Sequence, residues 1–212
     1  MKNTSAFTLA EVLITLLIIG VISSIVIPGL INNTQDAEYK TAWKKAYADI
    51  SQATMRLTTD NGGTLKGASS NHDSFRNLYL PYLNSALSCN SGTSRGSCWH
   101  NDNTWKYLNG TNASKSDTAS VMINNGNLLR FFYIDSNCND TSYGIPECGH
   151  ITVDINGFKK PNINGKDIFW LHITATGTKP WGAQGDSAGY LPAVDCISTG
   201  EGYGCSALYL YQ

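Results

Sequence analysis

Residues 5–31 read SAFTLAEVLITLLIIGVISSIVIPGLI, and Glu11 is the one charged residue among them. As a helix, residues 7–31 would extend about 38 Å at about 1.5 Å per residue. The hydrocarbon core of a bilayer is about 30 Å thick. A carboxylate inside such a run costs about 2.5–3.5 kcal/mol on insertion scales and marks a functional position with a specific partner. We therefore predict a transmembrane helix in which Glu11 has a functional role.

The residues around this apolar run set the expected orientation. Lys2 is the one charged side chain before Glu11, and with the initiator amine it favours a cytoplasmic N-terminus. The run is too long for the apolar region of a cleaved signal peptide, and no A-x-A cleavage site follows it. We expect the rest of the chain to lie outside the cytoplasmic membrane.

Two residues weaken the apolar helix. Gly20 lowers helix propensity by about 1 kcal/mol relative to Ala, and Pro28 costs about 3 kcal/mol in a helix interior. The sequence leaves two interpretations open. Pro28 either produces a simple kink, or residues 20–29 form a segment that extends when subunits pack.

Beyond Ile31 the composition turns polar while the helical period persists. Apolar and aromatic residues recur at steps of three and four, which predicts one buried helix face that packs on a sheet. These residues are Tyr39, Trp43, Ala46, Tyr47, Ile50, Ala53 and Leu57. We expect the helix to end near Asp60, because Asn61-Gly62-Gly63 is a turn or C-cap signal.

The part from Gly62 onward is predicted to be a loop-rich head of short strands. Asp73 or Ser74 is expected to cap a short helix. Asn124-Asn125-Gly126 predicts a hairpin turn. The expected strands are Ala119–Ile123, Asn127–Ile134, Ile151–Ile155, Asp167–Ile173 and Ala207–Tyr211. Such strands with tight turns indicate an antiparallel sheet and an α+β fold.

All six cysteines lie in this head, as pairs of near neighbours. An even count behind a membrane segment is typical of disulfides in an oxidising compartment, and no C-x-x-C suggests zinc. Six cysteines allow several connectivities, and neighbour pairing is our working assignment. It joins Cys89 to Cys98, Cys138 to Cys148 and Cys196 to Cys205.

Charge composition excludes one class of partner. Charged residues make up 15% of the chain and the net charge is −1. A nucleic-acid-binding domain needs a basic stripe to neutralise phosphates. We expect no nucleic-acid partner.

The residues quoted at the start resemble the prepilin N-terminus shared by type IV pilins and type II secretion pseudopilins. The short basic leader, Phe7, Glu11 and the apolar run with Gly20 and Pro28 match that pattern. Ala6 stands where this family usually has Gly before the scissile bond. The resemblance implies a pilin-like fold, with a leader at 1–6, a membrane and assembly half of the helix at 7–31, an amphipathic half at 32–61 and a head at 62–212.

The resemblance also implies processing and partners. A membrane prepilin peptidase would cut between Ala6 and Phe7 and the new amine of Phe7 would be methylated. The subunit would then assemble with other pilins or pseudopilins at an inner-membrane platform. An α-amine, with a pKa of about 7.7–8.0, would thus appear at the depth of Glu11. We expect Glu11 of one subunit to pair with the Phe7 amine of another, because paired buried charges offset much of their burial cost.

Residues 153–169, VDINGFKKPNINGKDIF, look similar to a strand–turn–strand motif of secretion-type pseudopilins. The side chains of Asp154, Asn156, Asn162 and Asp167 offer oxygen atoms, which Ca²⁺ accepts. Their spacing does not match an EF-hand, and Asn or Asp beside Gly commonly forms turns. A structural role and a calcium site both remain open.

Two other functions compete with a plain structural subunit. A minor pilin whose head binds a surface, glycan or other ligand would use exposed aromatic residues, and Trp99, Trp105, Trp170 and Trp181 are the candidates. A signal-anchored enzyme would need a catalytic constellation, yet the four histidines are scattered and neither H-E-x-x-H nor G-x-S-x-G occurs. We expect a structural subunit that is no enzyme, with His172 as a structural residue of a strand.

Overall fold

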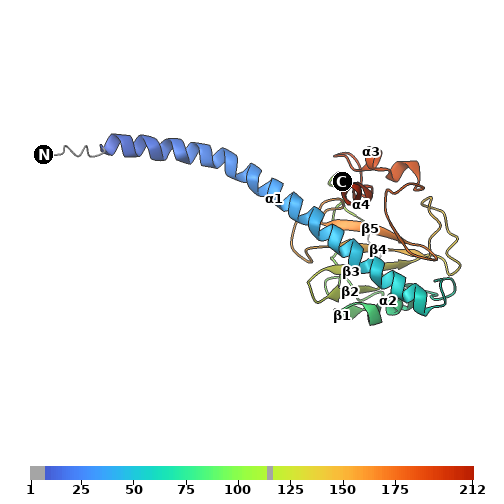
Figure 1. Cartoon of the computed structure of the whole chain (residues 1–212). Coiled ribbons are helices and arrows are strands. Elements are labelled where there is room, and N and C mark those ends of the chain that lie inside the picture. The colour runs from blue at the N-terminus through green and yellow to red at the C-terminus, as the bar shows by residue number, and fades with distance from the viewer. Residues whose placement is uncertain (1–7, 114–116) are drawn as a thin grey trace. The chain divides into compact units, whose positions relative to one another are not determined.

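The computed structural model describes residues 8–113 and 117–212 (Figure 1). Its first element is helix α1, Leu9–Asp60. The helix ends where Asn61-Gly62-Gly63 predicts, since the Gly63 N–H donates to Thr58 O at 2.8 Å and both glycines have positive φ angles. The chain divides into two units, one up to Glu38 and one from Tyr39 onward, and α1 contributes to both.

The first unit is the apolar part of α1. An 18-residue window of this helix has a mean hydropathy of 2.6, and its side chains are exposed. By length and composition it is able to cross a membrane. The helix continues through Gly20 and Pro28 without interruption. Residues 20–29 are therefore helical in this structure. Their extension when subunits pack stays a prediction.

The second unit is built on a six-stranded sheet in the order β1-β2-β3-β4-β5-β6, with every neighbouring pair antiparallel. The strands are β1 Ser85–Cys89, β2 Ser120–Ile123, β3 Leu128–Tyr133, β4 Gly149–Asp154, β5 Ile168–Ile173 and β6 Thr178–Pro180. The remaining helical elements are α2 His72–Tyr79, η1 Leu80–Tyr82, η2 Ala188–Tyr190, α3 Pro192–Asp195 and α4 Cys205–Tyr211. The predicted α+β fold with a small antiparallel sheet is confirmed in this pilin-like layout.

One face of the sheet packs on the amphipathic half of α1, which crosses the strands (Figure 1). Phe131, Ile151 and Leu171 lie opposite one another on β3, β4 and β5 and are fully buried there. From α1, Trp43 stacks on Phe169 with ring centroids 4.7 Å apart. The Trp43 indole N–H donates to Ser206 O of α4 at 2.9 Å. The predicted apolar face of the helix is therefore part of the head's core.

The other face of the sheet is also covered, by the long loops that follow β1 and β6. Its row of side chains includes Arg130, Thr152 and Trp170, which lie opposite one another and are buried. A second apolar cluster fills this side, with Trp99, Trp105, Trp170 and Trp181 among its members. Because both faces are covered, every residue of β4 and β5 is buried, including the polar His150, Thr152 and His172.

Several local predictions need correction. Ala207–Tyr211 is part of helix α4, where a strand was predicted. The alternation of Ala-Leu-Tyr-Leu-Tyr suits a strand, but the segment packs as a helix turn against Trp43 and Trp170 through Ser206. The N-cap of α2 is Asn71 rather than Asp73 or Ser74. Ser74 instead occupies N3, where it completes a capping box with Asn71.

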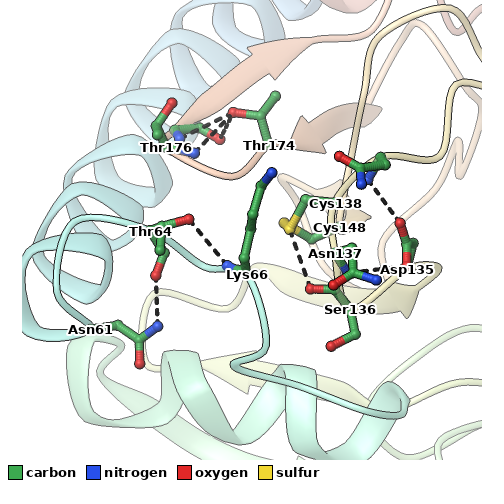
Figure 2. Close-up of a disulfide and its surroundings, with 12 residues drawn as sticks. Asn61, Thr64, Lys66, Asp135, Ser136, Asn137, Cys138, Cys148, Thr174 and Thr176 are labelled. Carbon is green, nitrogen blue, oxygen red and sulfur yellow. Dashed lines mark hydrogen bonds between the residues drawn. A yellow bond between two sulfur atoms is a disulfide. The ribbon is translucent and has the colours of Figure 1, made fainter.

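Three disulfides join Cys89 to Cys98, Cys138 to Cys148 and Cys196 to Cys205. These are the neighbour pairs of our working assignment. Figure 2 shows Cys138–Cys148 beside the loop that follows α1. That loop is held on both sides, because the Leu65 N–H donates to Ala175 O and the Gly67 N–H donates to Ser136 O, each at 2.8 Å.

Candidate functional site

The N-terminus of α1 holds Glu11 in a capping box. The Glu11 carboxylate oxygen Oε2 accepts the Thr8 N–H at 2.8 Å and the Thr8 hydroxyl at 2.9 Å. In return, Thr8 Oγ1 accepts the Glu11 N–H at 3.3 Å. This reciprocal pattern satisfies two backbone donors that the first helical turn leaves free. Sequence reasoning missed the role of Thr8, although the signal T-x-x-E stands in the chain.

The capping box leaves part of the Glu11 carboxylate for another partner. Within the part of the chain that the structure describes, no hydrogen bond reaches Oε1. The side chain is exposed on the first unit. Ala6 and Phe7, the predicted cleavage and methylation positions, lie outside the described residues. The geometry supplies one half of the predicted pair, a carboxylate with an available oxygen.

Inside the head, the structure brings His150 and His172 together around Glu147. His172 Nδ1 lies 2.7 Å from Glu147 Oε2, and its Nε2 lies 2.9 Å from Asp186 Oδ1. His150 Nδ1 is 3.7 Å from Glu147 Oε1, which is too long for a hydrogen bond. The Asp186 carboxylate also accepts the Gly182 N–H. His172 thus bridges two carboxylates beneath the loops.

Burial and charge shift the pKa values of this cluster in opposite directions. Burial alone would lower the pKa of His172, but its contacts with Asp186 and Glu147 outweigh burial and raise it above 6.5. Burial alone would raise the pKa of Glu147, yet His150 and His172 bring it below 4.5. Burial lowers the pKa of His150. The cluster is therefore a buried ionic network around a charged His172, which agrees with a structural role for this residue.

The other two histidines lie elsewhere. His100 Nε2 is 2.7 Å from the buried Asp154 Oδ2. His72 Nδ1 accepts the Tyr133 N–H at 2.9 Å. Each has a defined structural partner.

The four candidate tryptophans are buried, each with at most 4% of its surface exposed. The Arg130 guanidinium lies over Trp99, Trp105 and Trp170, between 4.7 and 5.6 Å from their ring centroids. Burial lowers the pKa of Arg130 to about 10, so it remains a cation at neutral pH. These aromatic residues form a core around a buried cation, and Trp170 and Trp181 also line a hollow of about 230 Å³.

The candidate calcium residues are used by the fold. Asp154 pairs with His100 and also accepts the Asn156 N–H at 3.0 Å. The two Asp167 oxygens accept the Asn162 and Ile163 N–H groups at 2.7 Å each. Across residues 8–113 and 117–212, no group of three or more His, Cys, Asp or Glu side chains is placed to hold a metal ion. The hydrogen bonds that these carboxylates accept from the turn support the structural alternative, and the Ca²⁺ site stays a prediction.

A groove of about 670 Å³ opens beside this turn. Phe158, Lys160 and Asn162 line one side, and His100, Thr104 and Lys106 line the other. Sequence reasoning singled out the stretch containing Phe158 to Asn162, but it did not pair this stretch with the loop around His100. The groove is open to solvent and is lined by polar and apolar side chains alike.

Comparison with known proteins identifies the N-terminal segment. Residues 1–27 match the family model described as the prokaryotic N-terminal methylation motif. No curated protein and no solved structure matches the chain. The motif is the prepilin-type signal, and it supports a pilin- or pseudopilin-type precursor.

The motif and the fold together define the class. An apolar N-terminal helix followed by an antiparallel sheet with disulfides is the layout of a pilin-like protein. The motif and the helix fit an inner-membrane anchor and processing by a prepilin peptidase. A structural subunit agrees with this signal better than an enzyme does.

Proposed function

We propose that the chain is a structural subunit of a type IV pilus or of a type II secretion pseudopilus. The observation that carries the proposal is the methylation motif at residues 1–27, which leads directly into an apolar helix. The precursor is stored in the inner membrane with its head outside the cytoplasm. It then enters a filament, at an assembly platform, by packing its N-terminal helix against those of other subunits.

The processing steps follow from the motif. A prepilin peptidase cuts between Ala6 and Phe7, and the amine of Phe7 is methylated. The cut removes Lys2 and creates a new cation four residues before Glu11. An unpaired Glu11 carboxylate surrounded by lipid costs free energy. Pairing with the Phe7 amine of a neighbouring subunit removes part of this cost and so favours entry into the filament.

Glu11 provides the register in this assembly. Its Oε2 is held by Thr8, and no described residue donates a hydrogen bond to its Oε1. The carboxylate therefore keeps its helix cap while its second oxygen accepts the amine of a neighbour. Since a buried ion pair offsets the desolvation of its two charges only when its geometry is close and well oriented, the contact fixes the axial position of one helix against the next.

Intact mass and N-terminal sequencing of protein purified from membranes test the processing. We expect a chain that begins at Phe7 and carries one added methyl group. A chain that still begins at Met1 would contradict the proposal. Ala6→Gly, which restores the residue usual before the scissile bond, serves as a control for complete cleavage.

Two variants of Glu11 test the assembly step. Glu11→Gln keeps an oxygen for the capping box but removes the charge, whereas Glu11→Ala removes both. We expect both variants to be processed normally and both to be lost from sheared filaments. If Glu11→Gln enters filaments as well as the wild type, helix capping suffices and the proposed ion pair is wrong.

The similarity of residues 153–169 to a motif of secretion-type pseudopilins favours a pseudopilus over a surface pilus. Deletion of the coding sequence separates the two. Loss of protein secretion with surface filaments intact supports the pseudopilus, and loss of surface filaments with normal secretion supports the pilus.

A second candidate function is a minor subunit whose head binds a ligand. The groove beside Phe158 favours it, because its lining carries two exposed lysines together with amide and hydroxyl groups. Such a subunit would still use the same N-terminal helix for assembly.

A further inference from the structure

The groove is built from two loops that are far apart in sequence. Lys106 and Ile163 form a parallel β-bridge between them. The Lys106 N–H donates to Asn162 O, and the Asn164 N–H donates to Lys106 O, each at 2.9 Å. The two walls are therefore joined along their base.

Both walls are also fixed from behind. Cys89–Cys98 closes the loop that leads to His100, and the buried Asp167 carboxylate holds the Asn162 and Ile163 N–H groups. Gly96 shows how closely the first wall is packed, since a Cβ there would lie 2.8 Å from the Asn101 side-chain oxygen. The groove thus has the preformed character of a binding site.

The first wall of the groove presents exposed polar side chains. Asn101, Asn103 and Thr104 line the groove and are exposed. Asn162 is buried and ties the two walls together, because its Nδ2 donates to Thr104 O at 3.3 Å. A ligand in the groove therefore meets amide and hydroxyl groups that are already held in place.

The charge of the lining is positive. Lys106 and Lys160 are exposed, and neither forms an ion pair with a described residue. No Asp or Glu belongs to the lining. The nearby Asp102 is paired with Arg95 at 2.9 Å. Two free ammonium groups in one hollow favour an anionic ligand.

The remaining lining favours a sugar. Asn101, Asn103 and Thr104 offer exposed amide and hydroxyl groups, which match the alternating donors and acceptors of a polyhydroxylated ring. Phe158 is 45% exposed and supplies an apolar ring, on which the C–H face of a sugar packs. Apolar anchor residues for a peptide are few here, and the net charge of −1 gives no basis for phosphate-backbone binding.

We propose that this groove binds an acidic oligosaccharide, with Lys106 and Lys160 attracting its carboxylates and Phe158 packing on a sugar ring. The proposal rests on the second candidate function, the ligand-binding minor subunit, and is independent of how the helix assembles. In this proposal, the turn within residues 153–169 forms one wall of the ligand-binding groove.

Calorimetric titration of the processed full-length chain, in a detergent without a sugar head group, tests the proposal. The probes are trigalacturonate and sialyllactose, each beside its neutral counterpart, methyl-esterified trigalacturonate and lactose. We expect at least one acidic probe to bind at least tenfold more tightly than its neutral counterpart, and added salt to weaken that binding.

Variants assign the binding to the groove. We expect the Lys106→Gln/Lys160→Gln pair to weaken binding at least tenfold, and Phe158→Leu to weaken the acidic and the neutral probe alike. Lys66→Gln/Lys179→Gln removes two exposed lysines outside the groove and serves as the matched control, with an unchanged Kd. Melting temperatures confirm that each variant is folded.

Three outcomes overturn the proposal. They are the failure of both acidic probes to bind at millimolar concentration, equal affinity for acidic and neutral probes, and a Lys106→Gln/Lys160→Gln pair that binds like the wild type. None of them affects the cleavage and filament tests, so failure here leaves the structural-subunit function standing.

Discussion

Glu11 has one set of partners in the described structure and a second set in the assembly that we propose. In the described structure it caps its own helix through Thr8. These bonds reduce the cost of an unpaired carboxylate near lipid, because hydrogen bonds to a charged group offset part of its desolvation. In the proposed assembly, the capping box stabilises the carboxylate in the stored precursor, and Oε1 then accepts the amine of a neighbouring subunit.

The buried His172 gives the head a pH-dependent stability. Its pKa is raised above 6.5, so its stabilising contribution is fully present below about pH 6.5 and is lost as the pH rises through the raised value. The pKa of Glu147 lies below 4.5, and this carboxylate stays charged across that range. We expect His172→Gln to lower the free energy of unfolding by about 3–5 kcal/mol at pH 6, because two buried carboxylates lose their partner.

Denaturant unfolding of the wild type and His172→Gln at pH 6 and pH 9 checks this sign. The difference between the two proteins should shrink at pH 9. His72→Gln is the control, since burial lowers the pKa of His72 and its contribution is lost as the pH falls. A gap for His172→Gln that widens with rising pH would contradict the charged-His172 network.

A calcium titration tests whether Asp154 and Asp167 bind a cation or serve only as hydrogen-bond acceptors of the turn. Asp154 and Asp167 already accept hydrogen bonds from His100, Asn156, Asn162 and Ile163. A ligand that binds only the native state must raise the melting temperature. We expect millimolar Ca²⁺ to leave the melting temperature within error of a Mg²⁺ control. A rise that depends on Ca²⁺ and disappears in Asp154→Asn would show that the predicted calcium site exists.

Trp43 is a large anchor of the amphipathic half of α1 in the head. Trp43 is fully buried, stacks on Phe169 and bonds to Ser206 O. We expect Trp43→Ala to cost about 3–5 kcal/mol, as for other large aromatic residues cut to Ala. Chemical denaturation measures the loss. Lys45→Ala, on the exposed side of the same helix, should change stability by less than about 0.5 kcal/mol, and an equal effect of both variants would refute the anchor.

Elements with strong local signals could be predicted from the sequence. The end of α1 follows from Asn61-Gly62-Gly63, and the β2–β3 hairpin follows from its Asn-Gly turn. Strand β1, Ser85–Cys89, was not predicted, because its sequence SALSC has no apolar alternation and its side chains are mostly exposed. Residues 207–211 of α4 were predicted as a strand, because the hydrophobic periodicity of five residues is too short to distinguish a helix from a strand.

The candidate sites also differ in whether a local sequence signal reveals them. The T-x-x-E cap and the methylation motif are contiguous, so both can be read from the chain. The groove needs the bridge between Lys106 and Ile163, and the His172 network needs Glu147 and Asp186 from two separate loops. Such contacts depend on tertiary packing, which no local pattern specifies.

The division of the chain at Glu38 and Tyr39 separates two kinds of chemistry. The first unit carries Glu11, the apolar surface and the processing signal. The second carries the sheet, the disulfides and the groove, all of them closed by contacts made after Tyr39. A change in either unit should therefore alter one property of the molecule and spare the other.

We expect a double dissociation between assembly and binding. Glu11→Gln should lose filament entry and keep the wild-type affinity for the acidic oligosaccharide, since the groove is formed wholly within the second unit. Lys106→Gln/Lys160→Gln should keep filament entry and lose that affinity. Sheared-filament yield and calorimetry on the same preparations measure both properties. If the groove pair also fails to assemble while its melting temperature is unchanged, the groove faces another subunit, and the independence of the two units is wrong.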